Sequence, residues 1–300
     1  MRWGDMRRSE NVEDRGGMAR GGGGFPIGGG GMRIGGGTLV VLLILSLVFG
    51  INPLEFLGMA GPEVSAPAPR TAPEQAAPSG GTAGAPTDQR KDLAARVVGD
   101  TEDVWNALFK SMGRDRYPPT TLTFYRGAVR SGCGTASSAA GPFYCPADQR
   151  VYLDTSFFDE LARRFGAPGD FAQAYVIAHE VGHHVQNLSG VMERFEREGQ
   201  RLDERRRNAL SIRVELQADC YAGVWGHFAQ KRNLLEPGDL EEGLRAAAAV
   251  GDDTIMKRTQ GYVVPDAMNH GTAEQRMRWF RAGLQSGDPR TCDTFGVAQP

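Results

Sequence analysis

His179, Glu180 and His183 form a His-Glu-x-x-His motif in the second half of the chain. Residues four apart lie one turn above each other on a helix, so the two imidazoles can bind one metal ion. Glu180 is one step further around the helix and can face a water on that ion. Residues 171–185 are largely apolar, which predicts a mostly buried helix. Because buried histidines need polar partners, a metal site is favoured over a chance arrangement, and His184 is expected to point elsewhere.

A third ligand must come from outside the motif, because catalytic zinc usually takes three protein ligands and leaves the fourth position to water. Glu215 and Asp219 lie one turn apart in residues 214–223, which also read as helix. Glu215 can ligate the metal, and Asp219 can accept the free ring N–H of a ligating histidine and so fix its orientation. The reverse assignment, with Asp219 as the ligand, stays open, as does an ordinary solvated acidic pair.

Glu-x-x-Ala-Asp after a His-Glu-x-x-His helix is similar to the gluzincin arrangement of zinc peptidases, in which the glutamate is the third ligand and the aspartate supports a histidine. Residues 133–148, 178–186, 215–220 and 270–276 together resemble the bacterial family of neutral zinc metallopeptidases, whose members carry an N-terminal membrane segment. The resemblance covers most of the chain from about Asp92 onward. It implies an α+β, zincin-like metallopeptidase domain that binds Zn²⁺.

His270 stands just before a predicted helix, because Thr272 and Gln275 fit a capping box. That position can present an imidazole to a cleft. In gluzincins a downstream histidine or tyrosine often stabilises the oxyanion, so the resemblance makes His270 the candidate for this role. The alternative is a residue with structural contacts only, and Tyr262 and Arg276 are weaker candidates.

The remaining pattern of the domain mixes helices and strands. Apolar residues recur at helical spacing over residues 92–112, and alternation predicts strands at 121–125 and 150–154. The strand at 150–154 either lies along the cleft and pairs with an extended peptide or belongs only to the structural sheet. His227 is expected to pack between helices.

The region before the domain falls into three blocks. Residues 1–37 are rich in glycine and arginine and are expected to form a disordered cytoplasmic tail. Residues 38–57 are apolar enough for a single transmembrane signal anchor, with a cleaved signal peptide as the alternative. Residues 58–90 read as a flexible linker rich in proline and alanine, and residues 91–300 as the zinc metallopeptidase domain.

Positive charge predicts the orientation of that anchor. The next basic residue after the apolar segment is Arg70, whereas six arginines precede it: Arg2, Arg7, Arg8, Arg15, Arg20 and Arg33. Because positive flanks stay in the cytoplasm, the chain is expected to be a single-pass cell-membrane protein. Its catalytic domain would lie on the extracytoplasmic, periplasmic side.

The four cysteines agree with an oxidising compartment. They are Cys133, Cys145, Cys220 and Cys292. Cys133 with Cys145 would close a loop, and the other two would tie the Glu215 helix to the C-terminal tail, but four cysteines allow three pairings and the sequence leaves them open. A structural zinc site fits poorly, since the spacing Cys-x-x-Cys does not occur.

These features predict a membrane-anchored zinc endopeptidase that hydrolyses polypeptides through a metal-activated water. The net charge of −2 argues against nucleic acid as a partner. Two alternatives remain: a zinc hydrolase of a non-peptide amide or ester, and a membrane-tethered binding or assembly protein whose zinc is structural.

Overall fold

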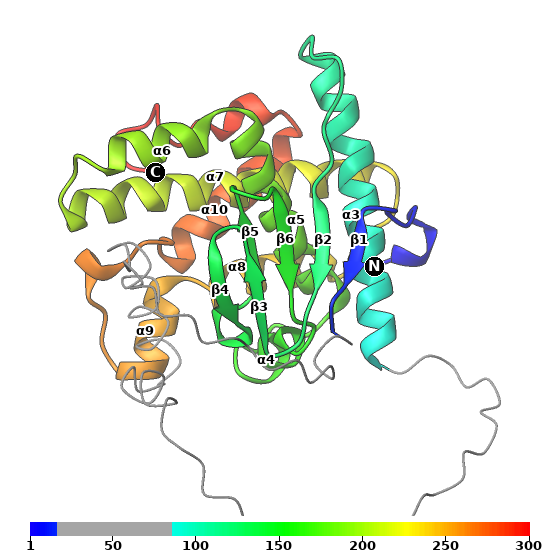
Figure 1. The fold of residues 1–300 in the computed structure, drawn as a ribbon, viewed down its shortest axis with the longest axis horizontal. Coiled ribbons are helices and arrows are strands. Elements are labelled where there is room, and N and C mark those ends of the chain that lie inside the picture. The colour runs from blue at the N-terminus through cyan, green and yellow to red at the C-terminus, as the bar shows by residue number, and fades with distance from the viewer. Residues whose placement is uncertain (17–85) are drawn as a thin grey trace, which may run out of the picture.

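A mixed β-sheet lies against a layer of helices in the computed structural model, which describes residues 1–16 and 86–300 (Figure 1). The strands of this sheet, in spatial order, are β1 (Val12–Asp14), β2 (Thr121–Phe124), β6 (Arg150–Leu153) and β5 (Phe143–Cys145). β1, β2 and β6 run parallel, whereas β5 is antiparallel to β6. The mixed architecture confirms the predicted α+β class.

Alternation along β6 explains the two faces of the sheet. Val151 and Leu153 pack into the main core with the helices, while Tyr152 faces the other way. There it stacks on Phe143 and joins a smaller cluster with the hairpin of β3 (Ala128–Ser131) and β4 (Gly134–Ser137). The hairpin therefore covers the face of the sheet that the helices leave open.

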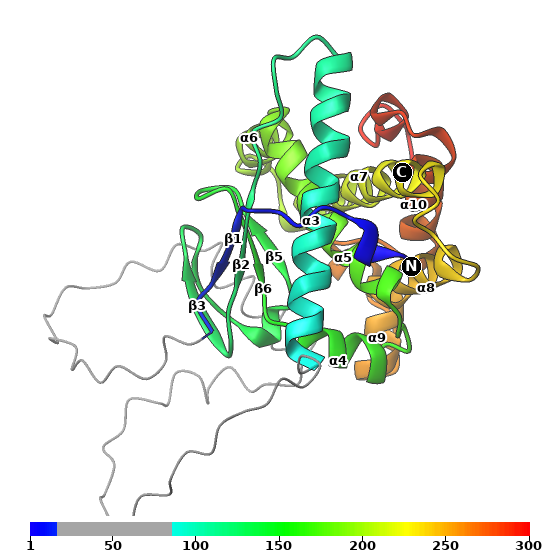
Figure 2. The same cartoon turned by 90° about the vertical axis from the view of Figure 1, so that its right-hand side faces the viewer.

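The helical layer is centred on the helix that carries the His-Glu-x-x-His motif. The α-helices are α3 (Pro86–Ser111), α4 (Phe157–Arg163), α5 (Asp170–Leu188), α6 (Val191–Gly199), α7 (Glu204–Lys231), α8 (Asp239–Ala249), α9 (Asp252–Gln260) and α10 (Ala273–Ser286). Short 3₁₀ turns are η1 (Trp3–Asp5), η2 (Ser138–Ala140), η3 (Pro265–Ala267) and η4 (Pro289–Cys292). α3, α7 and α8 all pack on α5, so that this helix is buried over most of its length, as its apolar flanks predict (Figure 2). The predicted capping box at the start of α10 is also present.

α7 and α10 cross with their backbones in contact. A Cβ added at Gly223 would collide with the carbonyl oxygen of Phe280, and one added at Gly283 would collide with that of Cys220. Glycine at both positions permits this approach. The close crossing brings Arg276, on α10, within hydrogen-bonding distance of Asp219 on α7.

Two disulfides join the four cysteines in the pairs Cys133–Cys145 and Cys220–Cys292. The first ties the turn of the β3–β4 hairpin to the end of β5. The second ties α7 to η4 and is fully buried. Of the three pairings that the sequence leaves open, the structure has this one.

The first residues of the chain belong to the folded domain. Residues 1–16 contain η1 and β1, so the prediction of a disordered tail over residues 1–37 is wrong for these sixteen. The predicted linker 58–90 also ends too late, because α3 begins at Pro86. The predicted anchor, residues 38–57, lies outside the described residues. In the two described parts of the chain, helices long and apolar enough to span a bilayer are absent.

Candidate metal centre

Three side chains from α5 and α7 bring their ligand atoms together. His179, His183 and Glu215 each offer one atom, and these atoms all lie within 4.8 Å of one another. Nε2 of His179 is 3.3 Å from Oε2 of Glu215, and Nε2 of His183 is 3.7 Å from Oε1. Tetrahedral zinc with bonds of about 2.0–2.1 Å places neighbouring ligand atoms roughly 3.3 Å apart. The donor set therefore fits zinc in both chemistry and spacing.

Asp219 holds His179 from the side away from this cluster. Its Oδ1 accepts a hydrogen bond from Nδ1 of His179 at 2.8 Å and another from the Tyr175 hydroxyl at 2.5 Å. Arg276 donates to both carboxylate oxygens, with Nε 2.8 Å from Oδ2. Because a carboxylate only accepts, Nδ1 of His179 carries a proton, and Nε2, which faces Glu215, can exchange its own proton for a metal ion.

His183 is oriented by a neutral amide. Gln186 donates through Nε2 to the carbonyl oxygen of Val214 at 2.7 Å, which turns its Oε1 towards His183. Nδ1 of His183 then donates to Oε1 at 2.9 Å. Both imidazoles thus present Nε2 to the same point.

The two helices must approach closely for Glu215 to reach the motif. A Cβ added at Gly182 would lie 3.0 Å from the carbonyl oxygen of Ala218 and 3.4 Å from its Cβ. That is tighter than ordinary van der Waals contact. Glycine between Val181 and His183 therefore sets the separation of α5 and α7 at the point where they share the cluster.

The pKa values of the clustered side chains indicate that the site attracts a positive charge. Burial lowers the pKa of His179, but the charge and hydrogen bond of Asp219 outweigh it and raise this pKa to about 10. Burial lowers the pKa of His183 to about 4. Burial also works to raise the pKa of Glu215, yet the nearby His183 and His270 hold it below its usual range. A divalent ion supplies the charge that these carboxylates attract and competes with the imidazole protons.

Glu180 lies next to the ligands but has a different environment. Its side chain is buried, and burial raises its pKa to about 7 against the opposing effect of His179. The backbone of Tyr144, in β5, also works against this rise in the pKa of Glu180. The carboxyl group therefore sits between the cluster and the outer strand of the sheet, with a pKa suited to exchanging protons near neutral pH.

The family model described as "Putative neutral zinc metallopeptidase" matches residues 1–295. The chain belongs to this family. It is 46% identical over 301 residues to "Uncharacterized protein YpfJ" of Escherichia coli K12, with 99% of each chain covered. It is 44% identical over 225 residues to "Uncharacterized protein Rv2575" of Mycobacterium tuberculosis, with 70% of this chain and 73% of that protein covered. No solved structure matches the chain.

In this member of the zinc metallopeptidase family, His270 stands just before α10. It lies at the rim of the cluster formed by His179, His183 and Glu215. Its charge contributes to the lowered pKa of Glu215. The carboxylate of Asp252 accepts from Nδ1 of His270 at 3.1 Å and from the backbone N–H groups of Asn269, His270 and Gly271. The imidazole is 46% exposed, and among the described residues its Nε2 has no hydrogen-bond partner.

The other residues considered from the sequence have structural surroundings. His184 is fully buried and uses both ring nitrogens, to the Tyr144 hydroxyl and the carbonyl oxygen of Pro118, so it points elsewhere as predicted. His227 packs between helices and donates to the carbonyl oxygen of Leu284. Arg276 lies behind Asp219 and not beside the ligand triangle, and Tyr262 is on an exposed loop.

Sequence reasoning missed three supporting residues. Tyr175 stands four residues before His179 and Gln186 three residues after His183, so both are neighbours on the same helix face and helical spacing would have found them. Helical spacing does not point to Asp252. It lies 18 residues before His270, and only the tertiary fold brings the two together.

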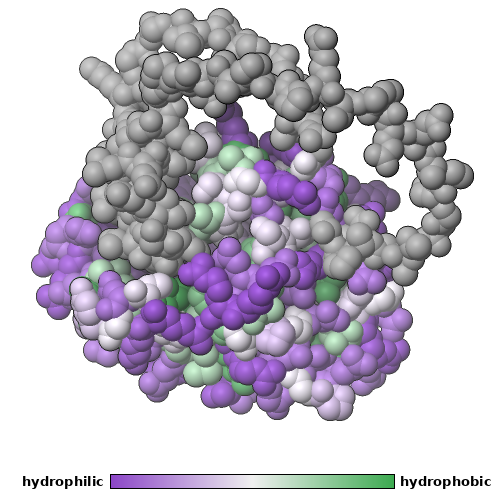
Figure 3. Space-filling view, turned by 90° about the horizontal axis from the view of Figure 1, so that it is seen from below, coloured by the Kyte–Doolittle hydropathy of each residue, from purple (hydrophilic) through white to green (hydrophobic). Residues whose placement is uncertain are grey.

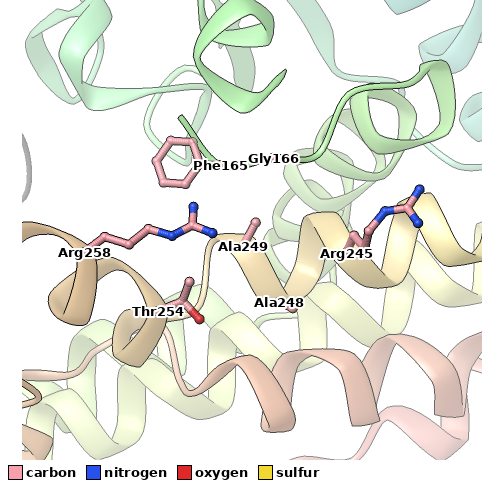
Figure 4. Close-up of a pocket in the computed structure, with 7 residues that line it drawn as sticks. All are labelled: Phe165, Gly166, Arg245, Ala248, Ala249, Thr254 and Arg258. Atoms are coloured by element: carbon pink, nitrogen blue, oxygen red, sulfur yellow. The ribbon is translucent and has the colours of Figure 1, made fainter. Parts of the chain in front are cut away.

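A separate surface hollow of about 240 Å³ lies between the loop after α4 and helices α8 and α9 (Figure 4). Its lining residues are Phe165, Gly166, Arg245, Ala248, Ala249, Thr254 and Arg258. The two arginines lie at opposite ends of it (Figure 4). Since this lining contains none of the groups that hold zinc or activate water, the hollow is not the hydrolytic site.

Proposed function

We propose that the protein is a zinc-dependent endopeptidase of zincin-like fold. The observation that carries the proposal is the convergence of His179, His183 and Glu215 with Glu180 beside them on the motif helix. Zinc held by three protein ligands keeps a fourth position for water and lowers the pKa of that water. A purely structural site usually has four protein ligands and does not need a buried carboxylate next to the metal.

Each protein group has a distinct task in this proposal. Glu180 accepts a proton from the attacking water and passes it to the leaving amine. His270 donates a hydrogen bond through Nε2 to the oxygen of the scissile carbonyl as negative charge develops on it. Asp219 and Gln186 keep the two ligating imidazoles in the required tautomer and orientation.

The sheet suggests how an extended substrate is held. The strand predicted at 150–154 is β6, which is paired with β2 on one side and β5 on the other, so it cannot accept a further strand. The interpretation of this strand as a structural one is therefore confirmed. Among the described residues, β5 stands at the end of the sheet, and the backbone of Tyr144 within it acts on the pKa of Glu180. We assign the substrate to this edge, where backbone pairing favours polypeptides.

The proposal is tested with the full chain, its Glu180→Gln form and a control, Glu193→Gln, in which the exposed Glu193 of α6 is changed in the same way. Zinc content and cleavage of unfolded casein are measured for all three. We expect equal zinc in the three proteins, cleavage by the parent and the control, and a rate at least about 100-fold lower for Glu180→Gln, since general-base catalysis contributes about 10²–10⁴. Failure of the parent to bind zinc would overturn the proposal.

Substrate class is tested with short peptides and with non-peptide amides and esters. Peptides that carry one N-methylated backbone amide on either side of the scissile bond lose a strand hydrogen bond without losing a side chain. We expect at least one such position to raise KM while the bond itself stays cleavable. If zinc is bound and only small amides or esters are hydrolysed, the non-peptide hydrolase is the correct alternative.

A further inference from the structure

Residues 1–16 are integrated into the domain by contacts that a loosely bound tail does not make. β1 pairs in parallel with β2, from Val12 opposite Leu122 to Asp14 opposite Phe124. Nε1 of Trp3 donates to Asp170, the first residue of α5, at 2.9 Å. The side chain of Met6 is buried in the main core. We call residues 1–16 the N-terminal strap.

Glu102, on α3, depends on the strap for its hydrogen bonds. This carboxylate is 9% exposed. It accepts from Arg7 at 2.7 Å, from the Ser9 hydroxyl at 2.6 Å and from the side-chain amide of Asn11 at 2.9 Å. Without these donors α3 would carry a buried, unpaired charge, which is strongly destabilising.

The backbone of α3 is shaped to let the strap pass. A Cβ added at Gly99 would collide with the carbonyl oxygen of Arg7 and would lie 2.7 Å from the backbone nitrogen of Ser9. That nitrogen donates to the carbonyl oxygen of Ala95 at 3.0 Å. Glycine at position 99 thus provides the space that the strap occupies.

We infer that residues 1–16 and 86–300 fold as one domain in one compartment, and that the chain between them does not cross a membrane a single time. Strands that hydrogen-bond lie about 4.8 Å apart, whereas a bilayer core is about 30 Å thick. One crossing between β1 and α3 would separate β1 from β2. The predicted single-pass topology is incompatible with this pairing, so the chain crosses an even number of times or not at all.

The two ends of the intervening segment lie at the same end of the domain. Nζ of Lys91, near the start of α3, is 2.6 Å from Asp14 at the end of β1. In Figures 1 and 2 the end of β1 and the start of α3 both lie towards the lower side of the molecule. The part of that face left uncovered in Figure 3 is mostly hydrophilic, with apolar residues only in small patches. The part of that face that Figure 3 shows therefore offers no large apolar surface to a bilayer.

The arginines that predict a cytoplasmic tail have another role in the fold. Four of the six that precede residue 38 form ion pairs with carboxylates of the domain or strap. These are Arg2 with Asp5, Arg7 with Glu102, Arg8 with Asp92 and Arg15 with Glu13. Arginines that form ion pairs within the folded domain are weaker evidence for the orientation of a membrane segment. The two disulfides favour the oxidising side of the membrane for the whole domain.

Cysteine labelling tests the shared compartment. Glu10→Cys in the strap and Glu241→Cys on α8 are separate variants of the full chain, and both positions are exposed. The native cysteines are all in disulfides. Spheroplasts are treated with a membrane-impermeant maleimide before and after permeabilisation. We expect the labelled fraction to change in the same way at both positions. Labelling of one position in intact spheroplasts and of the other only after permeabilisation would overturn the inference.

Cleavage within the intervening segment gives a second test that does not depend on labelling. A protease site is inserted between residues 60 and 80, and the cleaved protein is purified by a tag after residue 300. We expect the fragment with residues 1–16 to remain bound, and Gly99→Val to release it. Gly4→Val is the matched control, because a Cβ at Gly4 meets nothing within 4 Å. Loss of the fragment from the parent would contradict the inference.

Discussion

Asp219 and Asp252 each hold a histidine through Nδ1, but their surroundings differ. Asp219 is fully buried and receives hydrogen bonds from three side chains, those of His179, Tyr175 and Arg276. Asp252 receives three of its four hydrogen bonds from backbone N–H groups and holds an imidazole that is 46% exposed. The same chemical pair therefore serves two purposes. One fixes a candidate metal ligand between helices, and the other fixes a loop whose imidazole stays accessible.

This difference predicts which property each pair controls. The Asp219 pair is part of the core, so changes there should affect stability and zinc affinity together. The Asp252 pair is at the rim, so changes there should affect the rate with zinc still bound. Four variants test this division, in order of decreasing effect.

Asp219→Asn should have the largest effect. The change keeps the shape but leaves Arg276 without its counter-ion in a buried position, which costs about 3–5 kcal/mol of unfolding free energy. Zinc affinity should also fall by about 10–100-fold, as for other partners of ligating histidines. Denaturant unfolding and zinc competition with a chelator measure the two effects. Unchanged stability would show that Arg276 finds another partner.

His270→Ala should leave zinc content and unfolding free energy nearly unchanged, because the imidazole lies at the exposed rim. Loss of one oxyanion donor lowers kcat by about 10²–10³. Steady-state kinetics on a peptide substrate, with metal analysis of the same samples, checks this. His227→Ala serves as a control, since that imidazole packs away from the site. A variant that loses zinc would place His270 among the ligands instead.

Asp252→Asn should lower kcat by about tenfold, which corresponds to the loss of a charged hydrogen bond worth about 1.5 kcal/mol. The asparagine oxygen still accepts from the backbone, so the loop keeps most of its shape. If Asp252 acts through His270, the double variant with His270→Ala should be no slower than His270→Ala alone. Additive losses in kcat would contradict this coupling.

Tyr175→Phe should have the smallest effect. It removes one of the donors to Asp219 and leaves His179 and Arg276 in place. We expect a loss of about 1 kcal/mol in unfolding free energy and little change in zinc affinity. A drop in zinc affinity as large as that of Asp219→Asn would show that the hydroxyl itself orients the carboxylate.

The sequence predicts the parts of the site that depend on helical spacing. His179, Glu180 and His183 share one helix, and Glu215 and Asp219 share another, so their relative positions follow from 3.6 residues per turn. The structure adds that Glu215 faces Nε2 of His179 while Asp219 faces Nδ1, which separates the two roles that the sequence left open.

The parts that depend on pairing between distant segments could not be predicted in the same way. β1 has only three residues and pairs with a strand about 110 positions later. The glycine- and arginine-rich composition around it favours disorder more strongly than three residues favour a strand, so the sequence predicts a disordered tail there. The position of β6 inside the sheet depends on the order of the strands. Hydrophobic periodicity along the sequence predicts strands but not their order in the sheet.

The crossing of α7 and α10 has a consequence for genetics. At Gly223 and Gly283 the atoms that an added side chain would meet are backbone carbonyl oxygens of the opposite helix. A compensating mutation can shorten a side chain but not a main chain. Selections for intragenic suppressors of Gly223→Ala or Gly283→Ala should therefore recover true revertants to glycine, whereas suppressors of defects in side-chain packing should arise at many neighbouring positions.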